Sequence, residues 1–293
     1  MISRSVGGAA LLTVFLAARA LAAPVPVLPA ATPFKLGTAR MFSLSDMLNV
    51  VPNDGSIFAV GIDPKDVATV LSQAQARGDK ITLGVDALLM ITPQRVMLFD
   101  TGLGPKVGGV LPQSLASAGV TPDQVTDVLI THSHPDHIGG LVRSDGALAF
   151  PHATIRMSKR EWSYLQGHGD AKLVASLREK VQPFELGAEV APGVRSVDLP
   201  GHTPGHSGYE ISSGKDHLLD IGDVAHSSII SLARPDWAIR YDGDAPLGSA
   251  TRKAELAKLA ASHERVFAPH FPYPGVGFVV KDGATYSWRP SLP

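Results

Sequence analysis

The chain contains no cysteine among its 293 residues. This absence excludes disulfides, thiolate zinc sites, iron–sulfur clusters and cysteine nucleophiles, so any bound metal must be held by histidine and carboxylate side chains. An excess of charge of one sign is also missing, because 26 Lys and Arg residues accompany 27 Asp and Glu residues. The resulting net charge of −1 gives no electrostatic footprint for nucleic acid or for an anionic membrane, and we expect neither as a partner.

Motifs of three other chemistries are absent or broken. No G-x-S-x-G nucleophile elbow occurs in the chain. The segment Ser213-Gly214-Lys215 lacks the Ser or Thr that follows the lysine of a phosphate-binding loop. A glycine-rich turn begins at Gly102, but its third glycine, Gly108, falls one place late and Pro105 interrupts it. The sequence therefore does not favour a dinucleotide-binding protein.

Residues 1–22 have the features of a secretory signal peptide. Arg4 supplies the positive charge, residues 6–18 form a short apolar stretch, and Ala20-Leu21-Ala22 matches the cleavage pattern A-x-A. A membrane-spanning helix needs about 20 apolar residues, so a cleaved signal is favoured over a stable membrane anchor. We therefore predict a periplasmic or secreted protein whose mature chain, residues 23–293, forms a single domain.

Strand-like runs and helices are mixed along the mature chain without regular βαβ alternation. Asp63 and Pro64 predict a helix that ends near Gly78, Ser158 with Glu161 predicts the start of a second, and a last helix is expected over 252–262. The segment 24–33 is expected to be a flexible or extended lead-in. Strands are expected over 81–91, 95–99, 125–130, 194–199, 207–212, 217–221 and 265–268. This pattern favours α+β sheets that pack together with helices outside.

A run of seven residues, Thr131–His137, follows the apolar stretch 125–130 and carries three histidines and one aspartate. Side chains two apart point the same way from an extended backbone, so His132 and His134 can converge on one point. Asp136 and His137 follow a proline-bent turn and can reach a second point beside it. Imidazole nitrogen and carboxylate oxygen are typical zinc ligands. The run therefore predicts a site for more than one metal ion.

Three further candidate ligands, His202, Asp223 and His270, each follow a strand-like run and have glycine or proline neighbours that let the backbone turn sharply. A lone histidine after a strand is more often a loop or core residue than a ligand. The H-x-H-x-D-H run makes metal binding the favoured interpretation for all three. His206 is not expected to be a ligand.

These segments resemble the metallo-β-lactamase superfamily, and their order and spacing match it. The segments are 99–102, 131–137, 201–202, 222–223 and 269–270. The resemblance implies a four-layer αβ/βα sandwich of two mixed β-sheets with outer helices, and two Zn²⁺ ions per subunit, other divalent metals being possible. It implies that His132, His134 and His202 hold the first ion, that Asp136, His137 and His270 hold the second, that Asp223 bridges both, and that Asp100 orients the metal loop through hydrogen bonds.

Two metal ions that share a water lower its pKa and generate hydroxide without a side-chain base. A metal-bridging hydroxide would attack a carbonyl or phosphoryl centre of a small-molecule substrate while the second ion polarises the oxygen that gains charge. Asp136 or Asp223 would act as the catalytic carboxylate that holds the nucleophile and passes its proton to the leaving group. The sequence therefore predicts a metal-dependent hydrolase.

The segments 150–154, 200–207 and 270–277 are similar to the methyl parathion hydrolase group and its related lactonases. This similarity implies a lactone, ester or phosphotriester substrate. The aspartate at position 223 is typical of the lactonase, glyoxalase II and phosphotriesterase branches. A periplasmic zinc β-lactamase and a glyoxalase II-like thioesterase stay open as alternatives, and so does a non-catalytic metal-binding protein with closed coordination.

The substrate pocket is only weakly indicated. Phe42, Trp162 and Phe271 are candidates for an apolar leaving-group pocket, and plain core packing is the alternative for each. His226, three residues beyond Asp223, is a candidate substrate contact. Acyl-homoserine lactonases often carry a tyrosine there, which argues against specialised activity on those lactones. A homodimer is possible.

Overall fold

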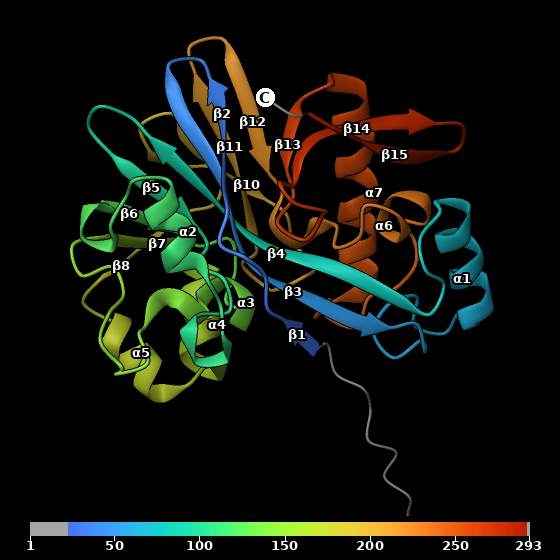
Figure 1. The fold of residues 1–293 in the computed structure, drawn as a ribbon, viewed down its shortest axis with the longest axis horizontal. Coiled ribbons are helices and arrows are strands. Elements are labelled where there is room, and N and C mark those ends of the chain that lie inside the picture. Colours follow the sequence, from blue (N-terminus) through green and yellow to red (C-terminus); the bar gives the residue numbers. More distant parts are fainter. Residues whose placement is uncertain (1–22, 292–293) are drawn as a thin grey trace, which may run out of the picture.

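A computed structural model describes residues 23–291 (Figure 1). They form two mixed β-sheets with helices on the outer surfaces, so the predicted α+β sandwich is confirmed. The order of the first sheet is β1-β3-β4-β5-β6-β7-β8, with β2 paired to β3, and that of the second is β15-β14-β13-β12-β11-β10-β9. The predicted signal peptide lies outside the described residues. Within them, no helix is long and apolar enough to cross a membrane.

The first sheet is antiparallel from β1 to β5 and parallel from β5 to β8. Its strands are β1 Ala23–Val25, β2 Ala31–Leu36, β3 Ala39–Pro52, β4 Lys80–Ile91, β5 Val96–Phe99, β6 Asp127–Leu129, β7 Thr154–Ser158 and β8 Val181–Phe184. The expected lead-in over 24–33 is extended rather than flexible, because β1 and the start of β2 pair with β3. The 14 residues of β3 escaped the sequence-based prediction, since buried and polar residues do not alternate along it.

In the second sheet only β12 and β13 pair in parallel. Its strands are β9 Glu189–Ala191, β10 Val194–Asp198, β11 Ser207–Ser213, β12 Asp216–Asp220, β13 Arg265–Phe267, β14 Val276–Asp282 and β15 Thr285–Pro290. The α-helices are α1 Pro64–Gln73, α2 Leu111–Ser117, α3 Pro135–Ile138, α4 Lys159–His168, α5 Ala171–Leu177, α6 Ile230–Ala233 and α7 Ala245–Ser262. Short 3-10 helices are η1 Pro105–Val107, η2 Pro122–Gln124, η3 Gly139–Leu141 and η4 Gly222–Val224.

Two helix boundaries differ from the sequence-based expectation. Asp63 caps α1 as predicted, but the helix ends at Gln73 because Gln75 adopts a left-handed φ of 59°. The last helix, α7, begins at Ala245 rather than near residue 252, and the Asp244 side chain accepts from Leu247 N–H there. Poor helix formers at Gly248 and Ser249 hide this early start in the sequence.

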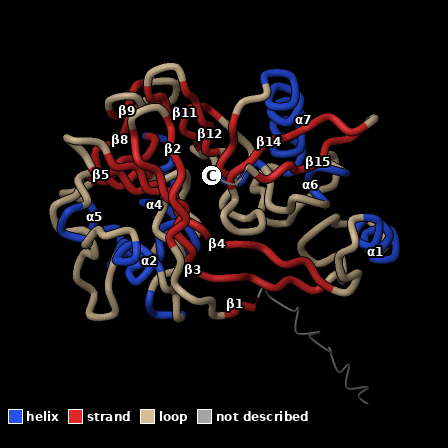
Figure 2. The backbone as a smooth tube through the Cα atoms, turned by 45° about the horizontal axis from the view of Figure 1, so that its top comes forward, coloured by secondary structure: helices blue, strands red, loops and turns tan. Residues whose placement is uncertain are grey.

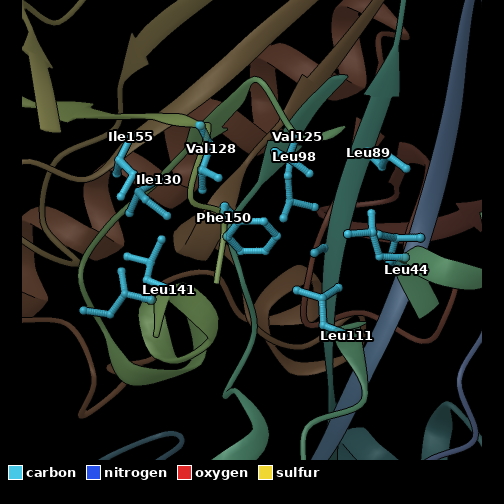
Figure 3. Packing of buried hydrophobic residues seen from close by; sticks show 14 of the residues in the cluster. Leu44, Leu89, Leu98, Leu111, Val125, Val128, Ile130, Leu141, Phe150 and Ile155 are labelled. Carbon is cyan, nitrogen blue, oxygen red and sulfur yellow. The ribbon is translucent and has the colours of Figure 1, made fainter. Parts of the chain in front are cut away.

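The hydrophobic core has layers on both faces of the first sheet. One cluster fills the space between that sheet and helices α2 to α5, and Leu89, Val128 and Phe150 belong to it (Figure 3). A second cluster lies between the two sheets, where Met41, Phe99 and Tyr209 meet. Figure 2 shows the two sheets side by side with helices at either side of them. The packed sheets fix the loops at one shared edge.

Candidate metal centre

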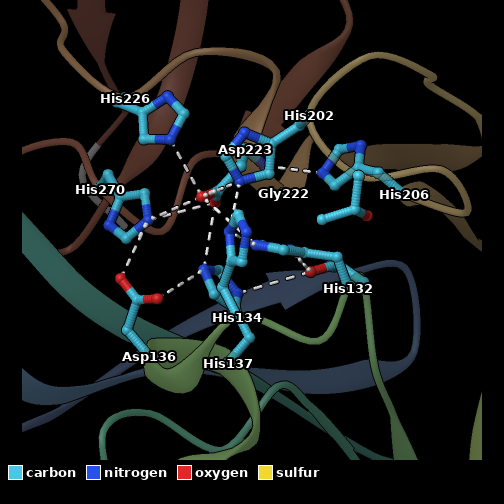
Figure 4. Close-up of polar contacts among 12 residues, drawn as sticks. His132, His134, Asp136, His137, His202, His206, Gly222, Asp223, His226 and His270 are labelled. Carbon is cyan, nitrogen blue, oxygen red and sulfur yellow. Dashed lines mark hydrogen bonds and ion pairs between the residues drawn. The ribbon is translucent and has the colours of Figure 1, made fainter. Parts of the chain in front are cut away.

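The candidate ligands lie in four loops at that edge, each after a strand (Figure 4). The histidine-rich run follows β6 of the first sheet and continues into α3, whose N-cap is His134. The loops after β10, β12 and β13 of the second sheet carry His202, Asp223 and His270. The cluster therefore forms only when the two sheets pack against each other.

One group of ligand atoms surrounds His134. Its Nδ1 lies 3.0 Å from His132 Nε2 and 2.8 Å from His202 Nε2. Asp223 Oδ2 lies 3.2 Å from His202 Nε2 and 3.6 Å from His132 Nε2. These four residues each offer an atom within 4.8 Å of the others, as a single metal ion requires.

A second group lies on the other side of Asp223. Its Oδ1 is 3.2 Å from His137 Nε2 and 3.1 Å from His270 Nε2. Asp136 completes this group, with carboxylate oxygens 3.8 Å and 3.7 Å from the same two nitrogens. The seven residues named by the sequence thus gather in two adjoining groups. Asp223 faces the first group with Oδ2 and the second with Oδ1, and Oδ2 also lies 3.3 Å from His270 Nε2.

The hydrogen bonding of two buried atoms in this cluster indicates whether a metal cation fits the site. His137 Nε2 and Asp223 Oδ1 are buried and lack a hydrogen-bond partner among residues 23–291. Unpartnered buried polar atoms are rare in folded proteins because desolvation makes them costly. A divalent cation would satisfy both, so the donor set fits a metal ion.

The electrostatics of the cluster differ from one histidine to the next. Burial lowers the pKa of His132 well below its usual range, and burial with the neighbouring His202 lowers the pKa of His134 to about 4. Burial also acts to raise the pKa of Asp223, but His270 and His137 outweigh it and hold that pKa well below its usual range. Burial also acts to lower the pKa of His137, His202 and His270, but Asp223 outweighs it and raises all three, that of His270 to about 9. Zinc binds neutral imidazoles and ionised carboxylates, so a bound ion would displace protons from these three rings.

Asp100 makes the contacts that the family resemblance implies. Its carboxylate accepts from Thr131 N–H and Thr131 Oγ1–H, both at 2.8 Å, and lies 2.8 Å from His137 Nδ1. It therefore fixes the direction of the His137 ring, whose other nitrogen faces Asp223.

His202 is oriented by residues that the sequence analysis missed. Its Nδ1 lies 3.0 Å from Asp242 Oδ1, while Asp242 Oδ2 accepts from Arg252 of α7 at 3.3 Å. Arg252 is only 1% exposed, and its other nitrogens donate to the carbonyl oxygens of Pro235 and Trp237. No local motif marks Asp242, because its partner is 40 residues away.

Glu161 joins two of the metal loops. It is fully buried at the start of α4. One carboxylate oxygen accepts from Ser133 N–H and Oγ–H, and the other accepts from Thr203 Oγ1–H and Gly205 N–H. Ser158 caps α4 as predicted, but the side chain of Glu161 is directed to the metal loops rather than back to the cap.

His206 supports Asp223 from behind, and the structure places it outside the ligand groups, as expected. Its Nε2 accepts from Asp223 N–H at 2.9 Å, and its Nδ1 lies 2.8 Å from Leu199 O. Burial and His202 lower the pKa of His206 to about 3, so the neutral ring can accept. A Cβ at position 222 would lie 2.6 Å from His206 Nε2, which explains why Gly222 precedes Asp223.

A pocket of about 260 Å³ opens beside the cluster. Its lining includes Asp136, Asp223 and His270 from the ligand groups, together with His226 and Tyr241. His226 Nε2 lies 3.0 Å from Asp223 Oδ2, and Asp223, His226 and His270 form a third group of possible ligands. His226 thus lines the pocket, and its contact with a substrate stays a prediction; Tyr241 was missed by the sequence analysis.

The three aromatic candidates for substrate contact do not line this pocket. Phe42 is buried in the core under the helices, and Trp162 packs against the same cluster. Phe271 is fully buried and packs edge-on against Trp288 at a centroid distance of 4.9 Å. All three side chains therefore pack in the core, which is the alternative that the sequence analysis left open for them.

The fold and the cluster together define a metal-binding protein built on a two-sheet sandwich. Residues 82–292 match the Metallo-beta-lactamase superfamily, and the chain belongs to this family. The resemblance noted in the sequence is therefore confirmed.

Two solved structures of hydrolases are similar to most of the chain. AidC, a dizinc quorum-quenching lactonase solved with a homoserine product, has a TM-score of 0.84 and 29% identity, covering 90% of this chain and 98% of its own. The hydrolase AbOPH has a TM-score of 0.81 and 27% identity, covering 91% and 99%.

Curated relatives match shorter stretches. The hydroxyacylglutathione hydrolase of Vibrio campbellii is 38% identical over 101 residues, which is 34% of this chain and 33% of that enzyme. The chain spans about a third to two thirds of the length of the curated relatives it matches. A hydrolase class for the chain is consistent with all of these neighbours.

Proposed function

We propose that the chain is a hydrolase that uses two divalent metal ions, zinc being favoured, to open a lactone or to cleave an ester or phosphotriester. The observation that carries this proposal is the position of Asp223. Its two carboxylate oxygens face two separate groups of ligands at 3.1 to 3.6 Å, as a bridging ligand must.

We assign the ligands by these groups. His132, His134 and His202 would hold one ion, Asp136, His137 and His270 would hold the other, and Asp223 would bridge them. Bound there, the ions would supply an electrophile and a water of lowered pKa.

The protein's own residues then position the reaction. Asp136 lines the pocket, and its carboxylate is 21% exposed, the most accessible of the acidic ligands. It is therefore placed to accept the proton of the attacking water and to return it to the leaving group. Asp100, Asp242 and Glu161 keep the ligand loops rigid through hydrogen bonds that exclude alternative rotamers.

A lactone or ester is the favoured substrate class. The pocket of about 260 Å³ admits a small molecule, and Leu83, Leu103 and Pro135 give it an apolar wall. Because the pocket lies beside the ligand groups, it supports a coordination position that is open to substrate. A closed site for metal storage or for structure would have no such position. The similarity to a lactonase and to another hydrolase over nine tenths of the chain supports the same class.

The test is a substrate panel combined with metal analysis of the purified mature protein. The panel contains a γ-lactone, an aryl ester, a phosphotriester, a glutathione thioester and a β-lactam. We expect two metal equivalents per chain and the highest kcat/KM for the lactone or ester. Dominant turnover of the β-lactam or the thioester would replace the proposal by one of those alternatives, and bound metal without any turnover would favour a metal-binding protein.

We also propose export of the chain to the periplasm or beyond, on the basis of the signal-like residues 1–22. N-terminal sequencing of the exported protein should begin at Ala23. Retention of Arg4 in the mature protein would contradict this proposal.

A further inference from the structure

A tyrosine that no sequence motif marks lies in the wall of the metal pocket. Tyr241 belongs to the connection between α6 and α7, and it lines the pocket with Asp136, Asp223, His226 and His270. The neighbouring residue, Asp242, contacts His202 instead. Two consecutive residues of one loop thus contribute to the same site in different ways. Tyr241 lines the pocket, and Asp242 contacts the proposed ligand His202.

The loop that carries Tyr241 is held in place on both sides. Arg240 N–H donates to Ile57 O at 2.9 Å, and Gly243 N–H donates to His202 O at 2.9 Å. The ion pair of Asp242 with Arg252 adds a contact to α7. Because these bonds flank Tyr241 directly, its position relative to His202 is fixed by the fold.

The ring of Tyr241 continues a layer of aromatic rings. Its centroid lies 5.9 Å from that of His226, whose ring stacks on His270 at 5.3 Å with an interplanar angle of 7°. The ring is half-buried, and no hydrogen bond joins its hydroxyl to another side chain or backbone group of residues 23–291. The hydroxyl of this pocket-lining residue is therefore free to donate.

The hydroxyl keeps its proton over the working range of a hydrolase. Burial, the largest cause, raises the pKa of Tyr241 above the value of about 10 that is usual for a phenol. A protonated phenol beside a polarised acyl group can stabilise the oxygen that gains negative charge during attack by water.

We propose that Tyr241 is a catalytic residue whose hydroxyl donates a hydrogen bond to the acyl oxygen of a lactone or ester bound in the metal pocket. This inference rests on the proposed hydrolase function. Water adds to the acyl carbon, the C–O bond to the leaving oxygen breaks, and the proton of the water ends on that oxygen, giving a hydroxy acid from a lactone. Tyr241 donates its hydrogen bond throughout without losing its proton.

His226, which also lines the pocket, is less suited to this role. His226 is 1% exposed and lies 3.0 Å from Asp223 Oδ2, so its ring is directed to the carboxylate. Tyr241 is more exposed to the pocket and has no competing partner among the described residues.

The test compares Tyr241→Phe with the wild-type protein. The variant keeps the ring and its packing against His226, and it removes only the hydroxyl. We expect kcat for the lactone or ester to fall about 100-fold with KM changed less than about 3-fold, in line with loss of one donor to the acyl oxygen. Metal content and the thermal midpoint should stay at wild-type values. Tyr286→Phe, in β15 and outside the pocket lining, is the matched control and should retain full activity.

A second readout does not depend on turnover. A cyclic alkyl phosphonate, which mimics the tetrahedral state of lactone hydrolysis, should bind the Tyr241→Phe variant about 10- to 100-fold more weakly by calorimetry. Wild-type kcat, or wild-type phosphonate affinity, in the variant would overturn the role of Tyr241. Loss of metal from the variant would overturn it as well, because the hydroxyl would then act on the metal site. Whether the chain is a hydrolase at all is tested separately, by measuring turnover of the substrate panel with the wild-type protein.

Discussion

At the residue scale, the site depends on single side chains whose partners come from distant parts of the chain. His202 is the clearest case, since it offers Nε2 to the first ligand group and Nδ1 to Asp242. His202→Ala should leave one metal equivalent per chain and remove most activity, because the first group would keep only two histidines beside the shared Asp223. His152→Ala, at an exposed position outside the ligand groups and the pocket, is the control. Elemental analysis that finds two full equivalents in His202→Ala would contradict the assignment.

Asp242 tests the outer contact of the same histidine. Asp242→Asn replaces the carboxylate at 3.0 Å from His202 Nδ1 by an amide, which lowers the basicity of the ring and permits the wrong orientation. We expect a 10- to 100-fold weaker metal affinity, measured by competition with a chelator. Asp123→Asn, at an exposed position in η2, should leave affinity unchanged. Equal affinities of Asp242→Asn and wild type would mean that Asp242 has only a structural role.

The seven proposed ligands were accessible to sequence reasoning because the H-x-H-x-D-H run is local and the later ligands follow strands beside glycine or proline. Asp242, Glu161 and Tyr241 were not accessible. Their partners lie 28 to 44 residues away or in the pocket, and each residue type is common at surfaces. Only the packed fold brings these side chains to the site.

At the element scale, helices with strong caps were predicted and elements without them were not. Asp63 and Ser158 start α1 and α4 as expected, since each accepts a hydrogen bond from the first turn. The strand β3 lacks alternation because its residues are buried on both faces, so no period of two is visible. The caps of α1 and α4 were therefore predictable, whereas β3 was not.

Glu161 makes α4 part of the metal site. Glu161→Gln replaces a buried carboxylate, which accepts four hydrogen bonds, by a neutral amide. The NH2 group of that amide would face two donors and could not accept from them. The free energy of unfolding should fall by about 2–3 kcal/mol in urea titrations, the magnitude of charged hydrogen bonds. Glu185→Gln, at an exposed position paired with Lys159, is the matched control and should change stability by less than about 1 kcal/mol. A loss as small as the control's would exclude the role of Glu161 as a link between the loops.

At the scale of the whole molecule, the two sheets meet behind the metal centre through polar groups as well as apolar ones. Tyr209 of β11 donates to Ile130 O at 2.6 Å, across the interface between the sheets. Asp220 of β12 pairs with Tyr209 in the sheet, and it lies close enough to Asp100 for the two carboxyl groups to interact. These contacts join the loops of the centre to the interface between the sheets, so changes at this interface should affect stability beyond the centre itself.

Asp220 makes that stability depend on pH. Burial and the neighbouring Asp100 raise the pKa of Asp220 to about 8. In the unfolded chain the pKa is about 3.9, so the folded state binds the proton more tightly. Stability contributed by the protonated carboxyl is therefore complete below about pH 4 and is lost as the pH rises toward about 8.

Asp220→Asn keeps a neutral acceptor for Gly222 N–H and removes this titration. Between pH 5 and pH 8, the free energy of unfolding should fall less steeply for the variant than for wild type, in urea titrations at matched metal loading. Asp282→Asn, at an exposed position of β14, should follow the wild-type curve. Parallel curves for Asp220→Asn and wild type would show that Asp220 is ionised in the folded protein. The carboxyl group would then need a charged partner at the interface between the sheets.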